Sequence, residues 1–171
     1  MAIRTTRLAG RDPLGVYLND HLAGATAGLE LARRMAASAE PGSEAVTLRK
    51  LVAEIAADRK TLIEVMAALG IPLRSYKVFA GWAGEKAARL KLNGRLLTRS
   101  PLSSLEETEM LRLGVEGKAA GWRTLRVLAE RERRLDAESL DELLARAARQ
   151  SDELEALRTG IAARMLAGDA R

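Results

Sequence analysis

Long runs of helix-periodic apolar residues make up most of this chain, and its four prolines fall only between those runs. Pro13 opens the first run, Pro41 lies in the turn after it, Pro72 follows the second run, and Pro101 precedes the third. Proline fits the first turn of a helix but breaks its interior. The sequence therefore predicts long helices whose ends lie near the prolines.

The apolar spacing predicts four long helices, over 13–39, 44–69, 104–133 and 139–166. Apolar residues in these ranges recur every three or four positions, which places them on one face of a helix. The range 104–133 is expected to bury Leu105, Met110, Leu113, Ala120 and Val127. Ala, Leu, Arg, Glu and Lys account for 103 of the 171 residues, whereas Val and Ile account for only 12. That composition favours helices over a sheet.

Capping residues support these boundaries. Asp12 and Ser43 precede the first two helices, Gly70 follows the second, and Ser-x-x-Glu capping boxes begin at Ser103 or Ser104 and at Ser139. The pattern predicts one all-α domain over 1–171, with hairpins at 12–69 and 105–166. The crossover at 70–104 contains its own helix over 75–92, and such a connector lets the helices at 44–69 and 104–133 run parallel.

The segments YLNDHLAGATAGLELARRMA and EMLRLGVEGKAAGWRTLRVLAE, with the helix lengths and connection order, carry a family resemblance. Over 12–166 the chain resembles the ferritin-like four-helix-bundle superfamily, in a bacterial branch that lacks the standard di-iron ligands. Ferritin-like enzymes take a Glu-x-x-His motif from each of two helices. This chain has one histidine, His21, and Leu18 stands where that motif needs a glutamate. The resemblance therefore implies the fold and not the di-iron chemistry.

Polar residues within the apolar stripes are the candidates for chemistry. His21 and Asp58 lie on their stripes, and Glu54 and Glu116 lie near the middle of their helices. One interpretation is an atypical metal or proton-transfer site of His21, Asp58, Glu116 and Glu54, in a metal-binding protein or an oxidoreductase. The others are a hydrogen-bonded core histidine with surface carboxylates, or a buried polar layer. The layer would join Asp58 and Glu116 to Gln150 and Ser151, with Lys118, Arg59 or Arg112 replacing a metal charge. No metal and no cofactor is predicted.

Glycines inside the helices need an explanation, because each costs about 1 kcal/mol relative to alanine. Gly24 and Gly28 form one G-x-x-x-G pair, and Gly117 and Gly121 form another. The favoured interpretation is close packing of the two helices at these pairs. The alternative is space for a ligand between them.

The crossover carries the net charge of the chain. Residues 70–104 hold seven basic residues and one acidic residue, and the remaining residues nearly balance. The candidate partner-binding residues are Lys77, Trp82, Lys86, Arg89, Lys91 and Arg95. A basic, aromatic helix of this kind suits an acidic protein, a nucleic acid or an anionic membrane surface. It also suits a connector that packs its aromatic residues on the bundle.

Other features limit the possible functions. The chain has no cysteine, which excludes disulfides, thiolate nucleophiles and zinc fingers. No export signal is visible, and no uncharged stretch, 22–29 included, is long enough to span a bilayer. We expect a cytoplasmic homodimer that acts through assembly or partner binding rather than as an enzyme. Val16, Ile63 and Leu111 are expected on its outer faces. The sequence names no substrate.

Overall fold

The computed structural model describes residues 12–74 and 101–168 as a bundle of long helices. Within these residues there are four helices and no strands, which confirms the all-α prediction. The helices are α1 (Pro13–Ser38), α2 (Ser43–Ala68), α4 (Pro101–Leu128) and α5 (Ala137–Gly168). None of them combines the length and apolar character needed to cross a membrane. The expected helix over 75–92 and the candidate partner-binding residues lie outside the described residues.

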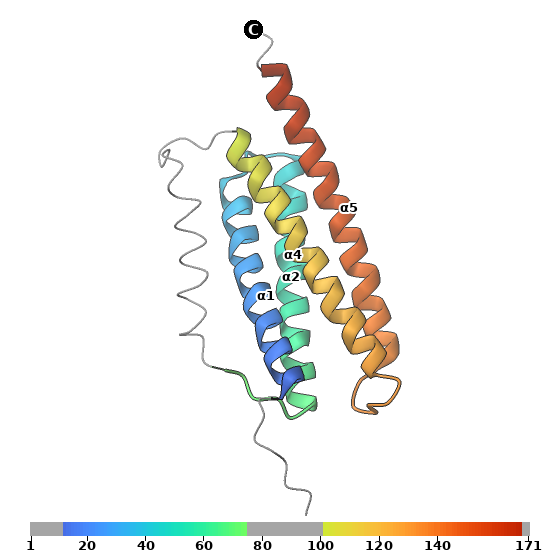
Figure 1. Ribbon diagram of the computed structural model, residues 1–171. Helices are drawn as coiled ribbons and strands as arrows, with labels where there is room; N and C mark the ends of the chain where they lie inside the picture. Colours follow the sequence, from blue (N-terminus) through green and yellow to red (C-terminus); the bar gives the residue numbers. More distant parts are fainter. Residues whose placement is uncertain (1–11, 75–100, 169–171) are drawn as a thin grey trace, which may run out of the picture.

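Each helix packs against two others. α1 lies beside α2 and α4, and α5 lies beside α4 and α2. α2 and α4 run in the same direction, opposite to α1 and α5 (Figure 1). At one end of the bundle, hydrogen bonds join α1 to the segment after α2 and to α4. Asn19 Nδ2 donates to Pro72 O at 3.2 Å, and Tyr17 Oη lies 3.0 Å from Thr124 Oγ1. The start of α1 thus meets the ends of α2 and α4.

Two of the predicted caps are confirmed, and three are wrong. Asp12 accepts hydrogen bonds from Leu14 N and Gly15 N. Gly70 has φ +72° just past the end of α2, a conformation that favours glycine. α2 instead begins after Gly42, without a side-chain cap, and Asp136 rather than Ser139 caps α5. α4 already begins at Pro101, so its capping serines lie inside the helix.

The core stripes of α2 and α5 follow the prediction, that of α1 does so in part, since Leu22 and Leu29 are buried more deeply than His21 and Gly28, and that of α4 does not. Met110, Leu113, Ala120 and Val127 are exposed, and the core side of α4 consists of other residues. These are Thr108, Leu111, Val115, Ala119, Trp122 and Leu125. Leu111, expected on an outer face, is therefore a core residue.

The buried apolar residues form two clusters, one toward each end of the bundle. One cluster includes Leu51 and Ile55 of α2, and the other includes Leu62 and Met66. Asp58 lies between these pairs along α2. The middle of the bundle is therefore where polar side chains enter the core.

Candidate functional site

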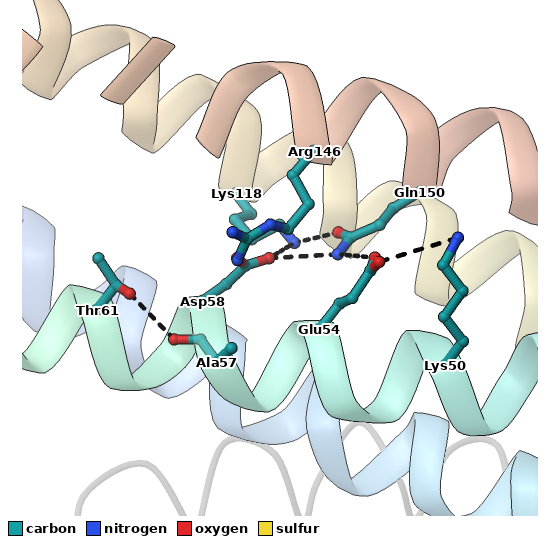
Figure 2. Close-up of polar contacts among 8 residues, drawn as sticks. All are labelled: Lys50, Glu54, Ala57, Asp58, Thr61, Lys118, Arg146 and Gln150. Atoms are coloured by element: carbon teal, nitrogen blue, oxygen red, sulfur yellow. Dashed lines mark hydrogen bonds and ion pairs between the residues drawn. The ribbon is translucent and has the colours of Figure 1, made fainter. Parts of the chain in front are cut away.

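Asp58 is the most deeply buried charged residue among those described, at 1% exposed. The apolar stripe of α2 carries it inward, because position 58 continues the series through Leu51, Ile55 and Leu62. Its Oδ2 lies 2.6 Å from Lys118 Nζ on α4, and its Oδ1 lies 2.8 Å from Arg146 Nη1 on α5. Two cations from two other helices thus hold one buried carboxylate (Figure 2).

Gln150 on α5 completes this arrangement. It is fully buried, and its Nε2 donates to Glu54 Oε2 at 3.0 Å and to Asp58 Oδ2 at 3.4 Å. Its Oε1 accepts a hydrogen bond from Lys118. We call Glu54, Asp58, Lys118, Arg146 and Gln150 the Asp58 network. Lys50 continues it toward solvent through ion pairs with Glu54 and Glu153.

Burial governs the electrostatics of the network. Loss of solvent lowers the pKa of Lys118 below its ordinary value, and the neighbouring Asp58 carboxylate opposes that shift. A charge buried this deeply is costly unless it is paired, and here every buried ionic group has a partner. The network therefore joins α2, α4 and α5 at one level of the bundle through paired charges and hydrogen bonds.

The predicted polar layer is confirmed in part. Asp58, Gln150 and Ser151 are buried, and Lys118 supplies the cation. Glu116 is exposed and accepts from Ser151 Oγ at 2.8 Å, so it lies outside the Asp58 network. Sequence reasoning missed Arg146, although its position four residues before Gln150 places both on one face of α5.

The two other candidate cations have different partners. Arg112 contacts Ser151 and Glu155, and Arg59 Nε donates to Thr26 Oγ1 at 2.7 Å. Arg59 makes no ion pair with any acid in the described part of the chain. No acid among the described residues therefore neutralises its charge.

A cavity of about 130 Å³ adjoins the Asp58 network between α1, α2 and α4. Its apolar wall includes Leu18, Ile55, Leu62, Leu111, Val115, Trp122 and Leu125. Asp58, Arg59, Lys118 and His21 supply its titratable groups. Gly24, Gly114 and Gly117 form part of the wall and are exposed, so the cavity can be reached from solvent.

The prediction of close helix packing at the glycines is wrong. A Cβ atom placed on Gly24, Gly28, Gly114 or Gly117 would meet no atom of the described residues within 4 Å. Gly121 differs, because a Cβ there would lie 3.1 Å from Nδ1 of His21. The imidazole of α1 rests on the backbone of α4, and this contact keeps the two helices apart beside the remaining glycines.

His21 lies on the cavity wall and packs edge-on against Tyr17, with ring centroids 4.4 Å apart. No hydrogen bond joins it to Asp58 in the described structure. Among the described residues, no group of three or more histidine and carboxylate side chains lies close enough together to hold a metal ion. His21, Asp58, Glu116 and Glu54 are thus not brought into one metal-binding group.

Stability should fall as the pH drops below 6.5, in part because of His21. Burial lowers the pKa of this imidazole below its ordinary value of 6.5, and the nearby Asp20 charge opposes the shift. Between 6.5 and the lowered pKa, the unfolded chain takes up a proton that the folded chain does not, so folding is disfavoured. Denaturant unfolding at pH 7.5, 6.5 and 5.5 should show a flatter pH dependence for His21→Gln than for the wild type. Equal slopes would contradict the prediction.

Comparisons with family models, with curated proteins and with solved structures find no match for this chain. The functional argument therefore depends on the cavity and on the Asp58 network beside it.

Proposed function

We propose that this protein acts by binding a small molecule in the cavity between α1, α2 and α4, rather than by catalysing a reaction. The observation that carries the proposal is the open space over Gly24, Gly28, Gly114 and Gly117. Each helical glycine costs about 1 kcal/mol relative to alanine. Among the described helices, no close contact at these four positions offsets that cost, whereas access to a cavity explains all four.

The size of the cavity suits a small ligand. An engineered cavity of about 150 Å³ with aliphatic and aromatic walls binds benzene. The cavity described here is of similar volume, at about 130 Å³, and the apolar part of its wall also consists of aliphatic and aromatic side chains. A single ring or a branched hydrocarbon group of that size would fill it.

The Asp58 network supports a binding role over a metal-dependent one. In a ferritin-like enzyme, metal ions would neutralise carboxylates at the middle of the bundle. Here Lys118 and Arg146 neutralise Asp58. We infer a ferritin-like topology, of the bacterial branch without di-iron ligands, and the parallel course of α2 and α4 supports it.

Assembly is a second candidate function, and one observation favours it. Met110, Leu113 and Val127 place apolar side chains on the exposed side of α4. A two-fold interface is the usual way to cover such a surface. The homodimer, and a partner site within 70–104, stay predictions.

The binding proposal can be tested with benzamide, a neutral single-ring probe, in an NMR titration. The indole N–H signal of Trp122, assigned by its loss in Trp122→Phe, reports on the cavity wall. Benzamide should shift that signal in a saturable way at millimolar concentration. If neither benzamide nor any other single-ring probe shifts it up to the solubility limit, the proposal is wrong.

Gly28→Leu should block the cavity without harming the fold. A Cβ at this position meets no atom, so the variant gains helix propensity and should unfold a few degrees higher than the wild type. Its side chain should weaken benzamide binding by at least tenfold. Gly160→Leu is the matched control, because Gly160 lies in α5 and away from this cavity. It should gain stability and keep the binding. Unchanged affinity in Gly28→Leu would contradict the assigned site.

A further inference from the structure

The polar groups on the cavity wall differ in how many hydrogen-bond donors or acceptors remain without a partner. Both oxygens of Asp58 already accept hydrogen bonds, from Lys118, Arg146 and Gln150. The Asp58 carboxylate is therefore the least available group to a ligand, although it lines the cavity. Its negative charge is also offset by the two cations that hold it.

The donors on the wall, in contrast, are not all used. A lysine ammonium carries three N–H groups, and Lys118 directs two of its hydrogen bonds to Asp58 and Gln150. A guanidinium carries five N–H groups, and the described partner of Arg59 is Thr26 alone. Lys118 and Arg59 thus line the cavity with N–H donors that have no partner among the described residues.

Trp122, another residue of the cavity wall, carries a donor without an acceptor. Trp122 is almost fully buried, and its Nε1 makes no hydrogen bond. Buried donors of this kind are rare, and each costs about 1–3 kcal/mol. His21 on the same wall has one ring nitrogen that can accept and one that can donate, so the two cations, Arg59 and Lys118, decide the preference, and they suit a ligand that brings acceptors.

From these observations we propose that the cavity binds a small organic anion, with a single-ring or branched hydrocarbon body and one carboxylate. The apolar wall holds the body, and Arg59 and Lys118 hold the carboxylate. This inference rests on the proposed function and adds the chemical class of the ligand. Arg59 is the main determinant, because its charge has no other partner among the described acids.

A comparison of benzoate with benzamide distinguishes the contribution of the negative charge to binding from that of the ring, because the two probes have nearly the same shape and differ in charge. Hydrogen bonds to charged groups are worth more than neutral ones, so benzoate should bind at least tenfold more tightly in the NMR titration. Equal affinities would overturn the proposed ligand class and leave the binding function standing. A failure of both probes to bind would overturn the binding function as well.

Arg59→Gln tests the site of the carboxylate, because glutamine keeps a donor for Thr26 and loses the charge. The preference for benzoate over benzamide should fall to a few-fold in this variant, with benzamide affinity unchanged, because Lys118 alone then holds the carboxylate. Lys60→Gln is the matched control, since it removes the same charge from the next residue, whose side chain is exposed to solvent. It should keep the full preference. If Arg59→Gln keeps the full preference too, the assignment of Arg59 is wrong.

Discussion

Replacement of Asp58 by alanine should lower the free energy of unfolding by about 3–5 kcal/mol, the usual cost of breaking a buried ion pair from one side. The carboxylate is 1% exposed, and its removal leaves Lys118 buried with Gln150 as its remaining partner. Arg146 is less affected, because 30% of its side chain already reaches solvent. The loss should therefore arise chiefly at Lys118.

Urea unfolding followed by circular dichroism measures this effect. Asp152→Ala is the control, because Asp152 lies on an exposed part of α5. It should change the free energy of unfolding by no more than about 0.5 kcal/mol. Asp58→Asn should be less costly than Asp58→Ala, because the amide retains an oxygen for one of the cations. A loss below about 1 kcal/mol in Asp58→Ala would mean that Lys118 reaches water in the folded chain.

The middle of the bundle could be predicted from the sequence because helix geometry is regular. A constant rise per residue places Asp58, Gln150 and Lys118 near one level once the hairpin turns are located. Their burial follows from the stripes on which Asp58 and Gln150 lie. Arg146 was not predicted, because a long side chain can reach a buried partner from the edge of a helix.

The cavity could not be predicted, because a G-x-x-x-G pair has the same sequence whether two helices touch or stand apart. The residue opposite decides between these outcomes. Here the His21 ring lies on Gly121 and separates the backbones, and that pairing requires the relative positions of α1 and α4. Periodicity within one helix contains no such information.

The sequence also does not determine which face of α4 lies inward. This helix carries two apolar stripes at helical spacing, one through Leu113 and Val127 and one through Leu111 and Leu125. Spacing alone does not say which of them faces the core. The size of Trp122 was the available signal, because so large an apolar side chain favours burial, and it lies on the second stripe.

Leu125→Ala and Leu113→Ala should therefore have very different effects, although both shorten a leucine of α4 in the same way. Leu125 is fully buried, so its truncation should cost about 2–5 kcal/mol through lost apolar burial and the space left behind. Leu113 is 67% exposed, and its truncation should stay within about 0.5 kcal/mol. Parallel denaturant titrations of the two variants give both values. Comparable losses would mean that Leu113 is covered in solution, as the predicted homodimer would require, and concentration-dependent unfolding of the wild type would then accompany them.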